Sequence, residues 1–277
     1  MILFIFEGNK REPRVLKTLN HLFLNGITDN DILFYYCSNI FSLYNLMKEY
    51  DVFNDSADLV NVLKETSPKN SEDSGLNKIK HSDEVSEIYL FFDCDFKKQD
   101  SKNKQSLEDQ YVEIKEMIAY FSDETRGKLY INYPMIESFR YFKKELPDYD
   151  YKDYVVDALI GHKFKKLADN DSIFKNFKNI CFDLDRKGNL KVPAPEIANT
   201  VLNNWKHING LNIRKANYIC TGSFCLPKEK ETICQDRILD NQIGKYIKPD
   251  KKLAIINSFP LFLYEYIDLD KDKKFFL

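Results

Sequence analysis

The sequence of 277 residues lacks the patterns that hold zinc. Its six cysteines include no CxxC pair, and its four histidines form no cluster. Cys220, Cys225 and Cys234 lie fairly close along the chain, but no histidine accompanies them. Zinc sites use cysteine and histidine at short, regular spacings, so we expect no zinc. No Ser/His/Asp constellation can be assigned either.

The sequence also lacks a strong net charge and any long apolar run. The formal charge is −2, so contact with nucleic acid would have to come from a local basic patch. No apolar stretch approaches the roughly 20 residues of a membrane span. Met1 leads straight into "ILFIF" without a charged leader, and the thiols are scattered. These features predict a protein of the reducing cytoplasm that does not contact a membrane.

Apolar residues are plentiful, at 43%, with 21 Phe and 17 Tyr, which indicates a globular protein with a substantial core. In the first half, apolar runs alternate with segments of helical periodicity. Continuous apolar runs are typical of strands that are covered on both faces of a parallel sheet. We expect strands over 1–6, 31–37, 87–95 and 128–134, with helices over 13–25, 38–50 and 106–123. The alternation predicts an α/β fold with a four-stranded, mainly parallel sheet.

Two regions depart from this alternation. Residues 54–86 are polar and predict an exposed, partly mobile insertion with a short helix near 57–64. The second half is predicted to be mostly α-helical, with the most apolar helix over 254–267, kinked or restarted at Pro260. We expect two domains, an α/β domain over 1–140 and a helical domain over 141–277. Three of the predicted helices in the second half cover 135–146, 151–164 and 254–267.

Two of the predicted strands end in acidic residues. The first ends in Glu7-Gly8, and the third ends in Asp93-Cys94-Asp95. With the strand order 2-1-3-4 the two ends are neighbours at the edge where ligands bind in open parallel sheets. Clustered carboxylates repel unless a cation neutralises them, and oxygen ligands favour Mg²⁺ or Mn²⁺. A lone DxD often only caps a helix or faces water, but the pairing with Glu7 favours a metal site.

These motifs resemble the TOPRIM domain. "FIFEG" and "LFFDCD" stand where that family has one Glu after its first strand and a DxD after its third. The resemblance covers residues 1 to about 140 and implies Mg²⁺-dependent phosphodiester chemistry. "EGNKREPRVL" resembles the opening of RloB-like proteins, with Arg11 in place of the usual Thr. "NYPMIESFRYF" resembles the stretch after the fourth strand in RloB-like and OLD-type nucleases, and Glu137 matches an additional Glu there. "FKKQDSKNK" follows the DxD without the glycine of the OLD pattern.

Other charged residues carry two interpretations each. Glu12 is either a second metal ligand or a favourable acid in a helix first turn. A set of basic residues could hold nucleic-acid phosphates or merely face water: Lys10, Arg11, Lys97, Lys98, Arg140 and Lys143. A second DxD, "FDLDR" at 182–186, is interpreted as a turn.

We therefore expect a Mg²⁺- or Mn²⁺-dependent endonuclease that acts on DNA or RNA, including tRNA. Its catalytic residues would be Glu7, Asp93, Asp95 and Glu137, with Glu12 as a further metal ligand. The resemblance to PARIS-type anti-phage proteins implies a toxin held by a separate ATPase subunit, since the chain has no Walker motif; a homodimer is the other expected assembly. The alternative is a non-catalytic docking module that binds the ATPase. A third interpretation, strand or nucleotidyl transfer, is disfavoured because no tyrosine-bearing breakage domain or primase zinc module is present.

Overall fold

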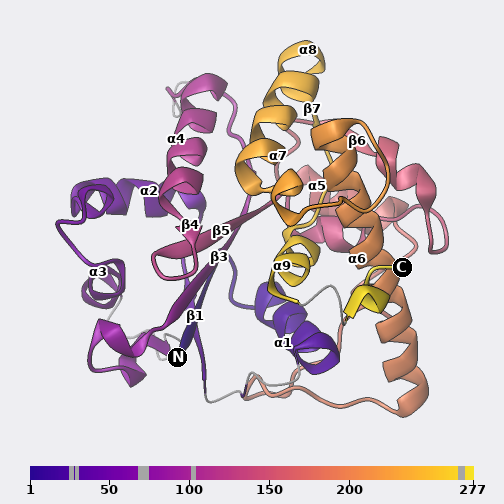
Figure 1. Cartoon of the computed structure of the whole chain (residues 1–277), viewed down its shortest axis with the longest axis horizontal. Coiled ribbons are helices and arrows are strands. Elements are labelled where there is room, and N and C mark those ends of the chain that lie inside the picture. Colours follow the sequence, from indigo (N-terminus) through magenta and orange to yellow (C-terminus); the bar gives the residue numbers. More distant parts are fainter. Residues whose placement is uncertain (25–27, 29–30, 68–74, 101–103, 268–271) are drawn as a thin grey trace. The chain divides into compact units, whose positions relative to one another are not determined.

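The structure is a computed structural model of the chain (Figure 1). It describes residues 1–24, 28, 31–67, 75–100, 104–267 and 272–277. The chain forms two compact units. The first unit comprises Met1–Pro13, Gly26–Phe92 and Gln99–Tyr130. The second comprises Arg14–Asn25, Asp93–Lys98 and Ile131–Leu277. This division differs from a single cut near residue 140, because two segments of the first half belong to the second unit.

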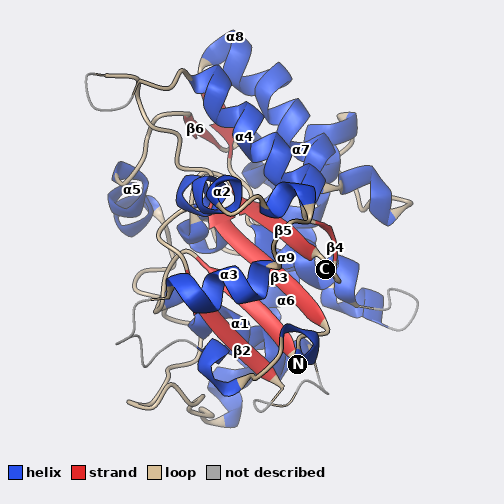
Figure 2. Ribbon diagram, turned by 90° about the vertical axis from the view of Figure 1, so that its left-hand side faces the viewer, coloured by secondary structure: helices blue, strands red, loops and turns tan. Residues whose placement is uncertain are grey.

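The sheet has five strands in the order β2-β1-β3-β5-β4, drawn red in Figure 2. Their bounds are β1 Ile2–Phe6, β2 Ile32–Tyr36, β3 Glu87–Asp93, β4 Ser122–Asp123 and β5 Gly127–Asn132. β1 pairs in parallel with both β2 and β3, whereas β4 pairs antiparallel with β5. The predicted α/β class and mostly parallel sheet are confirmed, and the long strands follow the predicted order. The prediction of four strands is wrong, because the sheet has a fifth strand, the two-residue β4.

Aromatic rings form the centre of the first unit. Phe4 and Tyr89 are register partners on β1 and β3, with ring centroids 5.5 Å apart. Phe91 stacks on Tyr130 of β5 at 5.2 Å. Residues two apart on a strand share a face, so these rings form one layer across the sheet. Cross-strand aromatic pairs each contribute about 0.2–1 kcal/mol, and the layer therefore stabilises the pairing of β1 with β3.

Three helices of the first unit lie together on one side of the sheet (Figures 1 and 2). They are α2 (Ile40–Glu49), α3 (Leu59–Thr66) and α4 (Leu107–Tyr120). α4 begins with a capping box between Ser106 and Asp109. α3 falls in the predicted insertion, but one side of it is buried, so that segment is not wholly exposed. Residues 68–74 of the predicted insertion lie outside the described residues.

The second unit is mostly helical. Its elements are α5 (Lys163–Asp171), α6 (Pro195–Thr221), α7 (Gln235–Asn241), a π-helix (Gln242–Ile247), α8 (Lys248–Asp250), α9 (Ser258–Tyr266) and the antiparallel pair β6 (Val155–Asp157) with β7 (Lys252–Ala254). α1 (Arg11–Phe23) begins in the first unit and continues in the second. α6 packs against α9. Trp205 of α6 is fully buried and stacks on Phe139 with 5.7 Å between centroids. α6 starts at Pro195, which suits the first helical turn, and ends at Gly222 with φ +83°.

Three predicted helices are partly wrong. Over 135–146 the structure has only a 3₁₀ helix, Ile136–Arg140, because tertiary hydrogen bonds engage its backbone: Ile136 N donates to Asp93 and Ser172 Oγ donates to the Arg140 carbonyl. Over 151–164 a 3₁₀ helix, Tyr149–Asp153, is followed by β6, and α5 begins only at Lys163. Over 254–267, α9 begins at Ser258, so Pro260 lies in its first turn and makes no kink.

Within the part of the chain that the structure describes, no helix combines the length and apolarity needed to cross a bilayer.

Candidate metal and nucleic-acid site

In the first unit, the candidate site begins at the end of β1. Glu7 follows Phe6 and is half-buried, while Glu12 lies in the first turn of α1 and is only 5% exposed. The Glu12 carboxylate folds over Gly8: a Cβ on Gly8 would lie 2.8 Å from Glu12 Oε2. A side chain at position 8 would therefore force the Glu12 carboxylate to move, whereas glycine leaves it in place. The sequence motif "EG" thus has a local structural reason in Glu12.

The charge of Glu7 also affects the pKa of a thiol, that of Cys37, at the end of β2. The Cys37 amide donates to the Phe6 carbonyl at 2.8 Å, which continues the pairing of β2 with β1. Burial, with a smaller contribution from the negative charge of Glu7, raises the pKa of the Cys37 thiol to about 11. Cys37 is therefore protonated at neutral pH.

In the second unit, Asp93 ends β3 with a carboxylate that is held from two sides. It is 5% exposed, and its Oδ1 accepts hydrogen bonds from Asn132 Nδ2 at 3.1 Å and from Ile136 N at 2.8 Å. Burying a carboxylate is costly unless donors compensate it. These two bonds supply donors and fix the carboxylate against the end of β5.

Asn132 is itself held by residues far along the chain. Its Oδ1 accepts from Asn257 Nδ2 at 2.9 Å, from Ser258 N at 3.0 Å and from Ser258 Oγ at 2.7 Å. Asn257 caps α9 by accepting from Phe259 N. The N-terminus of α9 therefore supports the residue that bonds Asp93. Sequence reasoning missed Asn132, Asn257 and Ser258, and only the position of Asn132 at the end of the fourth predicted strand could have signalled one of them.

Asp95 lies two residues on and is half-buried beside Gly161. A Cβ on Gly161 would lie 3.3 Å from Asp95 Oδ1, and Gly161 has φ +50°, a conformation that favours glycine. Cys94, between the two aspartates, is buried, and burial raises its pKa, with smaller contributions from Asp95 and Asp93. Cys94 is therefore a neutral packing residue rather than a ligand.

Glu137 is fully buried within the 3₁₀ helix Ile136–Arg140. Its neighbour Ile136 bonds Asp93, so the segment that carries Glu137 is attached to the DxD loop. Asp93 and the segment of Glu137 are thus brought together within the second unit, whereas Glu7 and Glu12 belong to the first.

The predicted phosphate-binding residues divide by exposure. Lys10, Lys97, Lys98 and Lys143 are exposed, and Arg11 is half-buried. Lys143 Nζ lies over the rings of Tyr141 and Tyr154, at 5.6 and 5.0 Å from the centroids. Such cation–π contacts leave the ammonium at the surface.

Arg140, in contrast, is 1% exposed and serves the interior of the second unit. Its Nη1 donates to the carbonyls of Ala168 and Phe174, each at 3.1 Å, and its Nη2 pairs with Asp169. These contacts give Arg140 a structural role, and we do not include it in the proposed nucleic-acid surface.

The second DxD forms a turn. Asp185 Oδ1 accepts from Lys187 N at 2.7 Å and from Asn189 N at 2.8 Å, and these bonds lower its pKa. The carboxylate therefore closes the loop around Gly188, as the sequence interpretation expected.

No group of three or more His, Cys, Asp or Glu side chains that could hold a metal ion is found among the described residues. What the second unit offers is a pair, Asp93 and Asp95, on one short loop. Mg²⁺ usually keeps several waters and is bound by one or two carboxylates together with substrate phosphates. The donor set fits such a partly hydrated ion, and it does not fit an all-protein cage.

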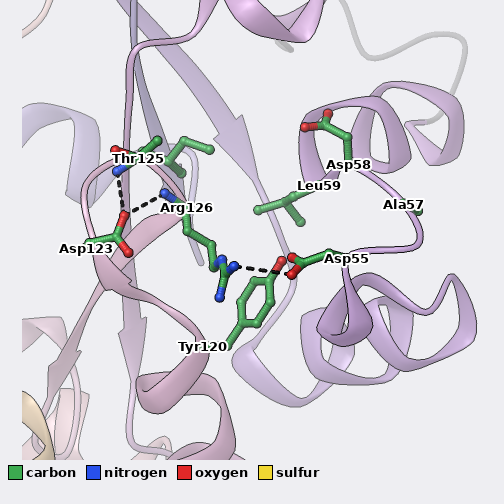
Figure 3. A pocket seen from close by; sticks show the side chains of 9 residues that line it. Asp55, Ala57, Asp58, Leu59, Tyr120, Asp123, Thr125 and Arg126 are labelled. Carbon is green, nitrogen blue, oxygen red and sulfur yellow. Dashed lines mark hydrogen bonds and ion pairs between the residues drawn. The ribbon is translucent and has the colours of Figure 1, made fainter.

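A separate cavity of about 750 Å³ lies within the first unit (Figure 3). Arg126 pairs with Asp55 at 3.2 Å and lies over the Tyr120 ring, while Asp123 accepts from the amides of Thr125 and Arg126. The polar groups at its rim thus bond one another, and we assign no ligand to it.

Comparisons with protein-family models, with curated proteins and with solved structures found no match to this chain.

Proposed function

We propose that this chain is a TOPRIM-type, Mg²⁺- or Mn²⁺-dependent nuclease that cleaves DNA or RNA phosphodiesters. One observation carries the proposal: β1 pairs in register with β3, Phe6 opposite Phe91, and β2 lies on the other side of β1. In an open parallel sheet, the place where the strand order reverses is the usual ligand site. The acidic residues Glu7 and Asp93 follow these two strands.

The properties of the acids support a hard divalent cation. Asp93 and Asp95 supply carboxylate oxygens only, and the thiol between them is held neutral by burial. We propose that Glu7, Asp93 and Asp95 bind the ion, with Glu12 as a further ligand. When bound, the metal supplies a Lewis acid that polarises the phosphodiester and favours ionisation of a water. Glu137 is proposed as the additional acid of the site, on the strength of its segment being bonded to Asp93.

The basic residues are proposed to hold the substrate. Lys97 and Lys98 follow Asp95 after one residue and are exposed, and Lys10 and Arg11 lie shortly after Glu7. Lysine and arginine contacts to phosphates give sequence-independent, salt-dependent affinity. Lys143 would extend this surface beyond the 3₁₀ helix of Glu137. The proposed setting, a toxin of an anti-phage system controlled by a separate ATPase subunit, rests on the sequence resemblance alone.

The test is cleavage by the purified chain. Wild type, Glu7→Gln and Asp93→Asn are incubated with DNA and with total tRNA, in Mg²⁺, Mn²⁺ or EDTA. We expect wild type to cleave one substrate with metal and not in EDTA, and both variants to lose at least 100-fold in rate, as removal of key electrostatic groups typically does.

Glu49→Gln is the matched control, because it removes one carboxylate charge from an exposed position at the end of α2. It should cleave like wild type. If wild type cleaves nothing, even with a candidate ATPase partner and a phage trigger present, the nuclease proposal fails. If the Glu7 and Asp93 variants cleave like Glu49→Gln, the assignment of the site is wrong.

A second candidate function is a non-catalytic docking module for an ATPase subunit. The observation that favours it is the lack of a three-carboxylate group among the described residues, together with the use of Asp93 as a hydrogen-bond acceptor inside the protein. On this alternative, Asp93→Asn would change the binding of neither Mn²⁺ nor substrate. Equilibrium binding of Mn²⁺ to wild type and Asp93→Asn separates the two functions.

A further inference from the structure

The hydrogen bond from Asn132 to Asp93 depends on which way the Asn132 amide is turned, and the surrounding groups fix that orientation. An asparagine amide has one face that donates and one that accepts, and either could in principle turn toward a neighbour. Here Asn132 Nδ2 donates to Asp93 Oδ1 at 3.1 Å. A reversed amide would place a carbonyl oxygen against a carboxylate oxygen, which is repulsive. The orientation of Asn132 therefore decides whether Asp93 is supported or repelled.

Three donors hold that orientation. Asn132 Oδ1 accepts from Asn257 Nδ2, from the Ser258 amide and from the Ser258 hydroxyl, at 2.9, 3.0 and 2.7 Å. A carbonyl oxygen has two lone pairs, so three donors saturate it. Turning the amide would leave these buried donors facing an NH₂ group, and unsatisfied buried donors each cost about 1–3 kcal/mol.

The donors are themselves fixed. Asn257 is fully buried, and its Nδ2 also donates to the Ile136 carbonyl at 3.1 Å and to Ser138 Oγ at 3.0 Å. Its backbone amide donates to Asn212 Oδ1 at 2.8 Å, which ties it to α6. Ser258 is also fully buried, in the first turn of α9. Asn132 therefore stands in a rigid polar cluster whose other members come from the second half of the chain.

We propose that Asn132 is a positioning residue for metal binding: it orients the Asp93 carboxylate toward the cation, and Asn257 and Ser258 lock Asn132 in the orientation that does so. This inference rests on the proposed function, because it takes Asp93 as a metal ligand. Hydrogen-bond partners of metal-ligating carboxylates typically affect metal affinity by 10- to 100-fold. The cluster thus makes α9 part of the site, although α9 carries no ligand.

The test measures Mn²⁺ binding to the full chain without substrate, by electron paramagnetic resonance of the free ion. We expect Asn132→Ala to bind Mn²⁺ about 10- to 100-fold more weakly than wild type. Ser258→Ala removes only one of the three locking donors and should weaken binding by a smaller factor, about 3-fold, in line with the loss of one hydrogen bond. In a cleavage assay, raising the Mn²⁺ concentration should restore the rate of both variants, because the loss is in affinity for the ion.

The matched control is Gln242→Ala. Gln242 is a fully buried amide of the same unit that bonds the backbone of Ala254 in both directions, at 2.7 and 2.9 Å. Both Gln242→Ala and Asn132→Ala should lower the melting temperature, because each removes a buried amide that forms hydrogen bonds. Gln242→Ala should nevertheless leave Mn²⁺ affinity and the Mn²⁺ dependence of cleavage unchanged. A purely structural role for Asn132 would make the two variants alike.

The outcomes are distinct. If wild type binds no Mn²⁺, the proposed function fails and the inference fails with it. If wild type binds Mn²⁺ and Asn132→Ala binds it equally well, or if Gln242→Ala is weakened as much, the inference fails while the proposed function stands. Should Asn132→Ala not fold, Ser258→Ala decides alone: Mn²⁺ affinity equal to wild type overturns the lock.

Discussion

Gly161 lies against the carboxylate of Asp95, at a distance where a side chain on residue 161 would press on that carboxylate. A Cβ on Gly161 would lie 3.3 Å from Asp95 Oδ1. Gly161 also has φ +50°, where an L-residue is disfavoured. The backbone that precedes α5 therefore forms one wall beside Asp95.

Gly161→Ala should therefore harm both stability and the site. We expect a loss of about 1–2 kcal/mol in the free energy of unfolding from the left-handed backbone, together with reduced Mn²⁺ affinity and cleavage. Gly188→Ala is the matched control, because Gly188 has φ +82° and the nearest atom to its Cβ is Lys17 Nζ at 3.7 Å. It should lose similar stability in urea unfolding and cleave like wild type. Equal cleavage by both variants would contradict the wall beside Asp95.

The stability of the fold should fall at alkaline pH because of its buried thiols. The pKa values of Cys37 and Cys220 are raised to about 11, in each case chiefly by burial. A raised pKa in the folded state means that the stabilisation is complete below the unfolded pKa, near 9, and is lost as the pH rises through about 11. Cys37 should contribute a slope of up to about 1.4 kcal/mol per pH unit in that window, and the more exposed Cys220 a smaller one, because solvent screens it. Urea unfolding between pH 8.5 and 11 measures it, and Cys37→Ala should remove one thiol's share.

The charge of Glu7 should be detectable through the reactivity of the Cys37 thiol. Because the charge of Glu7 raises the pKa of Cys37, Glu7→Gln should lower that pKa and increase the thiolate fraction at pH 9. Alkylation of Cys37 by iodoacetamide, followed by peptide mass spectrometry, should then be faster in the variant. The rate at the exposed Cys225 serves as the internal control and should not change. A slower or unaltered rate at Cys37 would contradict the proximity of the two groups.

Arg140 and Lys143 should separate structure from substrate binding. Arg140→Met removes the donors to Ala168, Phe174 and Asp169 and should cost about 3 kcal/mol in urea unfolding, since buried carbonyls lose their partners. Lys143→Met changes an exposed side chain and should stay within about 0.5 kcal/mol of wild type. In nucleic-acid binding, Lys143→Met should lower the salt slope by about 1. If Arg140→Met folds and lowers the salt slope while Lys143→Met does not, the roles assigned to these two residues are wrong.

Gly210 should be indispensable to the docking of the chain's last described residues. A Cβ on Gly210 of α6 would lie 1.8 Å from the Leu277 carbonyl oxygen, which also accepts from Arg214 Nη1 at 2.7 Å. Gly210→Ala should displace Leu277 and speed hydrogen exchange at its amide, which donates to the Lys206 carbonyl. Gly244→Ala meets no atom within 4 Å and should stabilise its helix by about 0.5–1 kcal/mol. Unchanged exchange at Leu277 in Gly210→Ala would contradict the contact.

The strands could be predicted from the sequence because their cause is local. A continuous apolar run such as "LFIF" indicates a strand that is buried on both faces, whichever strands lie beside it. The capping box at Ser106 likewise needs only residues three apart. The alternation of strand and helix indicates parallel strands, and the order of the long strands is the one assumed for them in the sequence analysis. These features require no knowledge of distant partners.

The surroundings of Asp93 could not be predicted in the same way. The segment 135–146 has helical periodicity, but its backbone bonds go to Asp93 and Ser172, which no local pattern indicates. Arg140 resembles a surface residue of a helix, and only the carbonyls of Ala168 and Phe174 explain its burial. Asn132, Asn257 and Ser258 carry ordinary polar side chains. Their role in supporting Asp93 follows only from the hydrogen bonds that they form with one another in the fold.

The hydrogen bond between Asn132 and Asn257 joins residues 125 positions apart. Ribosomes make proteins from the N-terminus, so the support of Asp93 is completed only after Asn257 and Ser258 have been synthesised. A fragment that stops before residue 257 contains every acidic residue discussed above, yet its Asp93 lacks the cluster behind Asn132. For a nuclease, this order of assembly would delay activity on the nascent chain until Asn257 and Ser258 have left the ribosome.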